Sequence, residues 1–333
     1  MTNVCNRKAV GALLHLHALT GVHWGSGSSL GTVDLPIQRE RHTEWPNGAG
    51  SALKGVLRDT CREAIAAKSH AGDRTKADSD SSIRRLFGSI KGAADTNAGA
   101  LCVTDARLLA FPVRSLKGVF AWITCPAVLT RLRRDAELAG IEYGPFDFDP
   151  ATAAPAIVAA AVANNQPSPA WIADGCPLVV ADEFLQLDDE TLTIAGDRIT
   201  ELANWISEHC LPAGDDYQAT RQRLAKHLVV VPDDVFTHFS KYATEVVARI
   251  GLDYKTKTVK TGALFYQELL PAESLMYSVL IVNESRSEDP ESGSNLLSEL
   301  TSMIGSSSVL QVGGDETTGK GYCSVHFSQG SQS

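Results

Sequence analysis

The sequence has no CxxC pair and no compact set of cysteines. Its seven cysteines are scattered along 333 residues, which fits reduced thiols and excludes both a disulfide framework and a zinc ribbon. No segment reaches the roughly 18 apolar residues that a membrane-spanning helix needs. The N-terminal stretch RKAVGALLHLHALTGVHWG is a poor signal peptide, because His15 and His17 interrupt it and its residues alternate as in a strand. We therefore expect a cytoplasmic protein without a membrane segment.

The sequence also lacks an excess of positive charge. Its formal net charge is -9 and its pI is near 5.5. Lys and Arg are needed to neutralise phosphates, so this balance argues against nucleic-acid binding over the whole surface, although it is compatible with a local basic stripe. No Gly-x-Ser-x-Gly elbow, kinase motif or dinucleotide fingerprint is present, and GSGSSLG lacks the strand–helix context that a nucleotide-binding loop needs.

Hydrophobic periodicity predicts interspersed strands and helices. Helices are expected at 51–68, 129–138, about 197–209 and 233–249, the last with Val235, Phe239, Tyr242, Val246 and Ile250 on one face. Strands are expected at 9–20 and in ALCVTDARLLAF, VFAWITCP, TKTVKTGALFYQELLP and SLMYSVLIVN, followed by a C-terminal hairpin, LQVGGDETTGKGYCSVHF. The regular alternation of a doubly wound fold is absent. We predict an α+β fold of ferredoxin-like type with insertions, forming one domain over 1–333.

Three segments are predicted to lie outside the core of this domain. Residues 68–82 are polar and read as a mobile loop. Residues 140–176 are rich in Pro and Ala and read as a peripheral insert. Residues 178–196 read as a strand or hairpin that leaves the core.

A basic stripe lies on the helix that begins near Ser51, the predicted N-cap. Lys54, Arg58 and Arg62 follow at i, i+4 and i+8. Together with the free N–H groups of the first turn, this stripe suits a phosphodiester backbone. The alternative is a solvated face paired with neighbouring acids.

Two further segments have both a backbone-binding and a structural interpretation. VGGDETTGKGY holds Gly313, Gly314, Gly319 and Gly321, which permit close backbone approach but also suit a tight hairpin. KTKTVK places Lys255 and Lys257 on one strand face, where they would contact phosphates or protect a sheet edge from aggregation.

Histidines near the N-terminus offer a metal-binding alternative. His15 and His17 would lie on one face of a strand, and His23 and Asp34 follow. Because no third ligand stands at a recognised spacing, hydrogen-bonded histidines are the simpler interpretation.

Several segments of this sequence, taken in order, resemble the backbone subunits of type III-B CRISPR effector complexes. They are HWGSGSSLGTVDLPIQRERHTEWP, GSALKGVLRD, FG, TDARLLAFPVRSLKGVFAWITCP, KYATEVVARIGLDYKTKTVKTGALFYQELLP and GGDETTGKG. These subunits belong to the superfamily of repeat-associated mysterious proteins (RAMP), and the resemblance runs from about residue 9 to 327. It implies a modified RNA-recognition-motif palm, an extended thumb hairpin placed at about 178–196, and copies stacked along a guide RNA beside the other subunits of the complex. It also implies cleavage of base-paired target RNA at regular intervals.

The resemblance also implies roles for individual residues. Asp34 stands at the cleavage aspartate, His23 at a second site residue and Glu268, approximately, at an acidic one. Ser51, Lys54, Arg58, Lys255, Lys257 and the glycines at 313, 314, 319 and 321 would contact RNA. Asp34 would act as a base or position a weakly bound Mg²⁺ or Mn²⁺. A non-catalytic RNA-binding scaffold and an unrelated hydrolase using His15, His17 and Asp34 are the alternatives.

Overall fold

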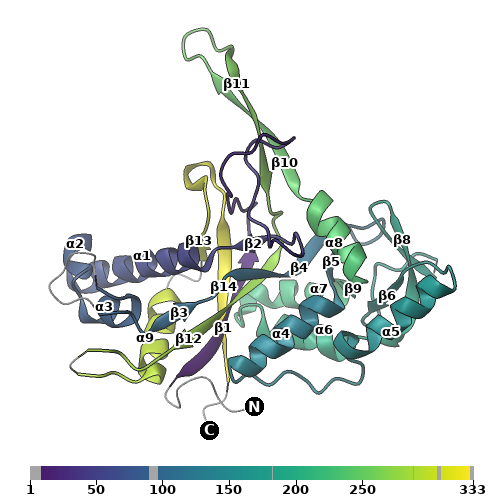
Figure 1. Cartoon of the computed structure of the whole chain (residues 1–333), viewed down its shortest axis with the longest axis horizontal. Helices are drawn as coiled ribbons and strands as arrows, with labels where there is room; N and C mark the ends of the chain where they lie inside the picture. The colour runs from purple at the N-terminus through teal and green to yellow at the C-terminus, as the bar shows by residue number, and fades with distance from the viewer. Residues whose placement is uncertain (1–8, 90–96, 182, 288, 306–308, 331–333) are drawn as a thin grey trace.

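The computed structural model describes residues 9–89, 97–181, 183–287, 289–305 and 309–330. Its main feature is a 12-stranded mixed sheet with the order β13-β14-β1-β12-β4-β5-β9-β6-β8-β7, in which β2 also pairs with β4 and β3 with β12 (Figure 1). The strands at one end are β13 (Val309–Gln311), β14 (Tyr322–Gln329), β1 (Val10–Ala18), β12 (Leu275–Val282), β4 (Ala106–Arg114), β3 (Leu101–Val103) and β2 (Asn47–Gly48). The remaining strands are β5 (Phe120–Thr124), β9 (Leu228–Val230), β6 (Pro169–Ile172), β8 (Glu190–Arg198) and β7 (Phe184–Leu187). The predicted α+β class is confirmed.

Strand β1 is the centre of the first half of the sheet. It pairs antiparallel with β12 on one side and β14 on the other, and His15 lies opposite both Tyr277 and His326. Its side chains are buried almost throughout, which explains why its sequence is apolar at nearly every position.

Helix α1 (Gly50–Ser69) buries Leu53, Leu57 and Cys61, as the helical periodicity predicts. It packs with α9 (Gly293–Gly305), α2 (Arg74–Ala77) and α3 (Ser81–Phe87). The prediction of Ser51 as N-cap was wrong: Ala49 occupies that position, and the carboxylate of Asp105 accepts the Gly50 N–H at 2.7 Å. The cap therefore comes from a distant part of the chain.

The segment predicted as a mobile loop, 68–82, contains α2 and the start of α3. The side chains of Asp73 and Asp80 accept main-chain N–H groups at the two helix starts. Aspartates that indicated a polar loop are therefore N-caps, so this prediction is corrected.

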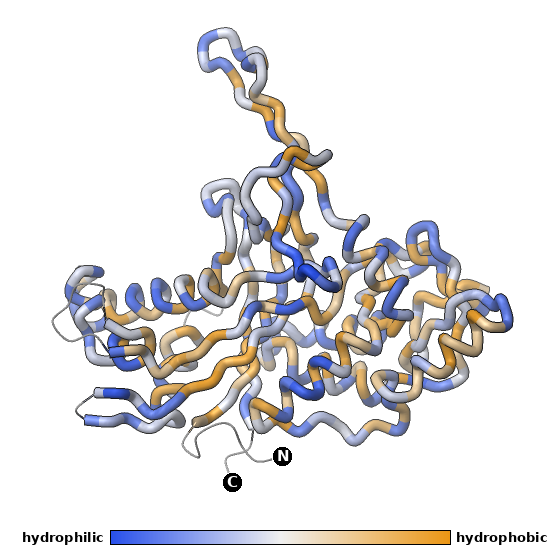
Figure 2. The backbone as a smooth tube through the Cα atoms, viewed as in Figure 1, coloured by the Kyte–Doolittle hydropathy of each residue, from blue (hydrophilic) through white to orange (hydrophobic). Residues whose placement is uncertain are grey.

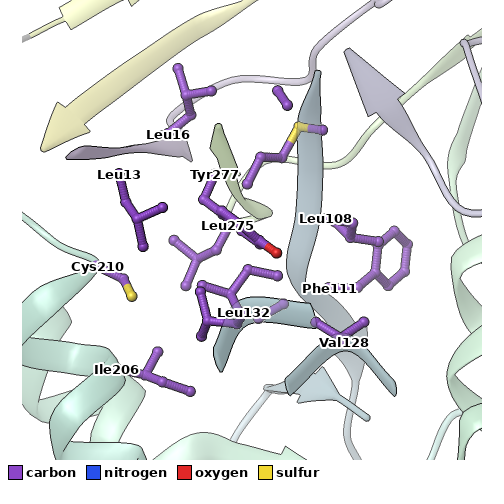
Figure 3. Packing of buried hydrophobic residues seen from close by; sticks show 14 of the residues in the cluster. Leu13, Leu16, Leu108, Phe111, Val128, Leu132, Ile206, Cys210, Leu275 and Tyr277 are labelled. Carbon is purple, nitrogen blue, oxygen red and sulfur yellow. The ribbon is translucent and has the colours of Figure 1, made fainter. Parts of the chain in front are cut away.

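A second group of helices packs along the main sheet, from β1 and β4 to β5 and β6. It consists of α4 (Pro126–Leu138), α5 (Pro150–Ala163), α6 (Thr200–His209), α7 (Gln218–His227) and α8 (Asp233–Tyr242). Leu132 of α4 and Ile206 of α6 pack with Leu13 and Tyr277 of the sheet (Figure 3). None of the helices in the described ranges is both long and apolar enough to cross a membrane.

The segment 140–176 is less peripheral than predicted. Its C-terminal part forms β6, which lies between β9 and β8, and Trp171 in that strand is fully buried. Only the preceding helix, α5, is an external layer, packed on α4. The prediction missed this core strand because it directly follows the Pro- and Ala-rich segment that forms α5.

The hairpin of β10 (Glu245–Leu252) and β11 (Val259–Leu269) forms a separate two-stranded sheet that projects from the body (Figures 1 and 2). The predicted helix 233–249 therefore ends early, at Tyr242. The projecting hairpin is also not at 178–196, because β7 and β8 belong to the main sheet and bury Leu185, Leu187 and Leu192. Both predicted boundaries are corrected.

Candidate functional site

The candidate site lies where the loop that follows β1 crosses the base of the projecting hairpin. The loop residue Leu35 donates its N–H to the carbonyl of Tyr266 at 3.0 Å and accepts the N–H of Glu268, also at 3.0 Å. On its other side, Gln38 donates to the carbonyl of Trp24 at 2.6 Å. The segment around Asp34 is thus held between the start of its own loop and β11.

Asp34 is a half-buried residue fixed by one of its two carboxylate oxygens. Its Oδ2 accepts the main-chain N–H of Tyr266 at 2.7 Å, 232 residues away in the sequence. Within the described ranges, Oδ1 has no hydrogen-bond partner. This arrangement holds the carboxylate in place and leaves one oxygen for a ligand.

His23 is anchored to the same strand, two residues further along. Its Nδ1 lies 2.8 Å from the carbonyl oxygen of Glu268. A carbonyl only accepts, so Nδ1 carries a proton, and Nε2 is the ring nitrogen that can offer a lone pair. A Cβ at Gly25 would lie 2.8 Å from that Nε2, so the absence of a side chain at Gly25 keeps the space beside it open.

The C-terminal glycine loop contacts the main chain of His23. Gly314 donates its N–H to the carbonyl of His23 at 2.9 Å. Gly313 has φ +76°, and a Cβ there would lie 2.3 Å from the same carbonyl oxygen. Only glycine combines easy access to this positive φ with the lack of a Cβ, so the backbone of this loop lies in direct contact with the His23 backbone. The predicted close approach of this loop is to protein backbone, and its contact with RNA stays a prediction.

Glu268 is in the site, but its carboxylate is fully engaged. Oε1 accepts from Arg39 at 2.5 Å and from Thr244 at 2.8 Å, and Oε2 accepts the Ile37 N–H at 3.1 Å. The carboxylate is nearly buried, with 8% of the side chain exposed. This geometry favours a positioning role for Glu268, which ties the residues that follow Asp34 to β11, over the catalytic role predicted for it.

Arg39 is a site residue whose contacts the sequence did not reveal. Its guanidinium bonds to Glu268, to the carbonyl of Glu44 at 2.7 Å and to the carbonyl of Ser240 at 3.0 Å. It joins the loop, the hairpin base and the end of α8. The alternating tract IQRER is the sequence feature that could have indicated an extended segment here, because strict alternation is typical of extended backbone.

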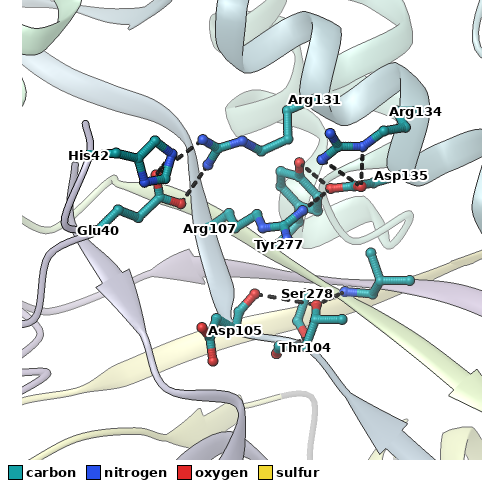
Figure 4. Close-up of polar contacts among 11 residues, drawn as sticks. Glu40, His42, Thr104, Asp105, Arg107, Arg131, Arg134, Asp135, Tyr277 and Ser278 are labelled. Atoms are coloured by element: carbon teal, nitrogen blue, oxygen red, sulfur yellow. Dashed lines mark hydrogen bonds and ion pairs between the residues drawn. The ribbon is translucent and has the colours of Figure 1, made fainter. Parts of the chain in front are cut away.

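A second anchor follows at Glu40. Arg131 of α4 donates to both Glu40 oxygens, at 2.6 and 3.0 Å (Figure 4). Burial raises the pKa of Glu40, but hydrogen bonds from Arg131 and Thr43 outweigh burial and hold it below its usual value. The same face of α4 carries Asp135, which binds Tyr277 and Arg107 (Figure 4). The loop is therefore attached to the rigid body of the protein.

The basic stripe on α1 is engaged within the chain. Lys54 donates to the carbonyl of Leu101 at 2.8 Å, and Arg58 lies 3.7 Å from a carboxylate oxygen of Asp78. Arg62 pairs with Asp78 at 3.2 Å. These contacts match the paired alternative more than an open phosphate site, while Ser51 is exposed at the helix start. Their contact with RNA stays a prediction.

Lys255 and Lys257 lie at the tip of the projecting hairpin, and not on a strand face as predicted. Asp253 closes the tip by accepting the N–H groups of Lys255 and Thr256, each at 2.9 Å. Lys257 adopts φ 57° there. The two ammonium groups are exposed, far along the hairpin from its base.

The alternative metal site is not formed. His17 bonds to Tyr217 and Glu273, each at 3.0 Å, and His15 is buried with both ring nitrogens unpartnered. Burial, with smaller effects of His326 and His209, lowers the pKa of His15 to about 3. Within the described ranges, no group of three His, Cys, Asp or Glu side chains could hold a metal. The hydrolase hypothesis built on His15, His17 and Asp34 is therefore wrong.

With this geometry established, comparison with known proteins identifies the family. A sequence profile of the RAMP superfamily matches residues 15–324. The chain belongs to the RAMP superfamily. It is 36% identical over 313 residues to the CRISPR system Cmr endoribonuclease Cmr4 of Pyrococcus furiosus, covering 94% of each chain. The RAMP resemblance inferred from the ordered motifs is confirmed.

Solved structures agree with this RAMP membership. The crystal structure of oligomeric Cmr4 from Pyrococcus furiosus superposes with a TM-score of 0.65 and 28% identity, covering 97% of this chain and 99% of that one. A chain of the type III-B Cmr-beta complex bound to cognate target RNA has the same fold, with a TM-score of 0.64 at 19% identity over 97% of this chain and 98% of that one.

Proposed function

We propose that this chain is a backbone subunit of an RNA-guided type III-B CRISPR complex and cleaves target RNA paired to the guide. The observation that carries the proposal is that Asp34 and His23 are both held by the main chain of β11, at Tyr266 and Glu268. The Pyrococcus relative named an endoribonuclease supports the reaction class. The oligomeric crystal form of that relative supports copies stacked into a filament on the guide.

The proposed architecture is a ferredoxin-like palm with a thumb. Support for the palm comes from the strand order β14-β1-β12-β4, with α1 and α9 in the positions of the two crossover helices. The thumb is the β10–β11 hairpin, which exposes Val246, Ile250, Phe265 and Tyr266. Apolar and aromatic side chains on a projecting element can stack on bases and separate them, so this hairpin is suited to enter the guide–target duplex.

The proposed reaction uses the 2′-hydroxyl of the target RNA as nucleophile. The 2′-O–P bond forms as the P–O5′ bond breaks; the 2′-hydroxyl loses a proton and the 5′-oxygen gains one. The products are a 2′,3′-cyclic phosphate and a 5′-hydroxyl end. The protein mainly has to align these atoms, as a wedge that unstacks one nucleotide would do.

His23 and Asp34 take different parts in this reaction. The Nε2 lone pair of His23, fixed by the Nδ1 bond to Glu268, accepts the 2′-hydroxyl proton. Asp34 offers the unpartnered oxygen of a carboxylate that Tyr266 holds in place. One free oxygen fits a Mg²⁺ or Mn²⁺ ion that takes its other ligands from RNA and water, and such an ion would be weakly bound. When bound, the cation would stabilise negative charge on the phosphate.

The proposal is tested by Asp34→Asn and Asp34→Ala in a complex assembled with guide and target RNA. Asn keeps an oxygen that can accept the Tyr266 N–H, whereas Ala does not. We expect both variants to cut target RNA at least about 100-fold more slowly and to retain the guide. Full-rate cleavage by both variants would reject the assignment and favour a non-catalytic scaffold; loss of the guide would make Asp34 structural.

The compartment is part of the same proposal. The described cysteines are free thiols: Cys61, Cys102, Cys125, Cys176, Cys210 and Cys323. Free thiols suit the reducing cytoplasm, where a CRISPR complex would meet its RNA.

A further inference from the structure

We propose that the pocket between α3 and the loop after β12 binds the phosphodiester backbone of single-stranded RNA, away from the site that cleaves. The pocket has a volume of about 470 Å³, and its lining includes Arg84, Arg85 and Arg286. The two contributing segments are about 200 residues apart in the sequence and lie on the same side of the molecule (Figure 1). This inference rests on the proposed RNA-binding function and adds a surface to it.

Among the described residues, the arginines of this pocket have fewer carboxylate partners than the basic stripe on α1. Arg84 and Arg286 are exposed and have no carboxylate partner within the described ranges. Arg85 makes one long contact, 3.9 Å, with Glu291. Asp289 is the one carboxylate among the described lining residues. On a chain of net charge -9, three arginines beside one carboxylate among the described lining residues form a local anion site.

The walls of the pocket are fixed by their own hydrogen bonds. Ser89 donates its N–H to the carbonyl of Asn97 at 3.1 Å, and its hydroxyl accepts the Asn97 N–H at 3.2 Å. On the opposite wall, Ser285 and Glu291 exchange two hydrogen bonds, at 2.9 and 2.8 Å. A preformed site loses little entropy when a ligand binds.

The chemistry of the lining favours a phosphodiester. Guanidinium groups bind phosphate oxygens through paired N–H donors. Ser81, Ser89, Asn97 and Ser287 add neutral polar groups of the kind that contact phosphate and sugar.

The experiment measures binding of a 5′-labelled single-stranded RNA of about 20 nucleotides to the full chain, by fluorescence anisotropy across about 50–200 mM salt. The double variant Arg84→Ala/Arg286→Ala is compared with Arg114→Ala/Arg134→Ala. The control removes the same charge from arginines that are 81% and 68% exposed but lie outside the pocket. We expect the pocket variant to bind on the order of tenfold more weakly, with a salt slope lower by about 0.7 for each lost phosphate contact. The control should match the unaltered chain.

Every outcome decides the question. No binding by the unaltered chain at 50 mM salt, or equal losses in both double variants, would overturn the pocket. Competition by inorganic phosphate as effective as by unlabelled RNA would show a free-phosphate site instead, and competition by polyglutamate would show an acidic-protein site. Target cleavage by Asp34→Asn and probe binding by the pocket variant are separate measurements. The pocket therefore stands if Asp34 proves non-catalytic, and the cleavage site stands if the pocket fails.

Discussion

Gly25 offers the sharpest test of the proposed chemistry, because its missing side chain keeps open the space beside the His23 ring. A methyl group there would lie 2.8 Å from Nε2 and 3.3 Å from Cδ2. The ring cannot move away freely, because Nδ1 bonds to the Glu268 carbonyl at 2.8 Å. Gly25→Ala should therefore block Nε2 or break the Nδ1 bond.

The size of the effect follows from these distances. A separation of 2.8 Å is what Nε2 would need to bond to an RNA hydroxyl, so the methyl group takes that place. Relieving the contact to about 3.5 Å requires a shift of roughly 0.7 Å, and a misplacement of about 1 Å can cost about 100-fold in rate. General acid–base catalysis contributes roughly 10²–10⁴-fold. We therefore expect cleavage about 100-fold slower, with guide binding unchanged and a stability loss of about 1–2 kcal/mol.

The assay is single-turnover cleavage of labelled target RNA by the assembled complex. Gly31→Ala is the matched control in the same loop, because its added methyl would meet only the flexible Ser29 hydroxyl, at 3.3 Å. His23→Asn keeps a donor near Nδ1 but has no Nε2. If both changes act through Nε2, Gly25→Ala combined with His23→Asn should be no slower than the slower single variant. Full-rate cleavage by folded Gly25→Ala, or multiplied losses in the double variant, would refute the role of Nε2.

Three further predictions concern the supports of the site. Glu268→Ala leaves Arg39 without its carboxylate and should lower the free energy of unfolding by roughly 3 kcal/mol in urea denaturation; an unchanged midpoint would contradict the anchor role. Gly313→Ala should reduce stability and cleavage together, because its Cβ would strike the His23 carbonyl; normal melting and normal cleavage would show that the contact is dispensable. Because the pKa of His15 is about 3 when folded and about 6.5 when unfolded, the unfolded chain binds more protons between these pH values, so stability falls as pH drops through that window. His15→Leu should remove about 2 kcal/mol of that loss between pH 8 and pH 5, and an unchanged pH profile would contradict the buried neutral state.

The errors in the predicted fold share a physical cause. In the segment after Tyr242, Val246 and Ile250 continue the helical spacing of Val235 and Phe239. Residues four apart face the same way in a strand as well, so this spacing cannot separate the two structures. The β-branched pair at 246 and 247 favoured the strand that forms. Hairpin propensity likewise says nothing about whether a hairpin joins the main sheet, as β7–β8 does, or projects.

The residues of the site could be predicted from the sequence, but the hydrogen bonds that hold them could not. Asp34 and His23 were singled out by the resemblance of their ordered motifs, since a lone aspartate in an extended loop carries little chemical signal. Their anchors on β11 lie 232 and 245 residues away. Contacts at such separation leave no local periodicity, so the engagement of the Glu268 carboxylate could not be read from the sequence.

The position of β11 connects the parts of the proposed mechanism. Its outer residues belong to the projecting hairpin, and its inner residues Tyr266 and Glu268 hold Asp34 and His23. Arg249 of β10 pairs with Asp315 of the glycine loop at 3.2 Å, and Asp315 also accepts from Gln267 at 2.5 Å. RNA that moves the base of the hairpin would therefore act on both candidate catalytic side chains and on the glycine loop, while Glu40 and Arg131 keep the far end of the Asp34 loop on the body of the protein. Such a connection makes alignment of the cut depend on how the hairpin is seated in the duplex, which is the form of control expected of an enzyme whose substrate supplies its own nucleophile.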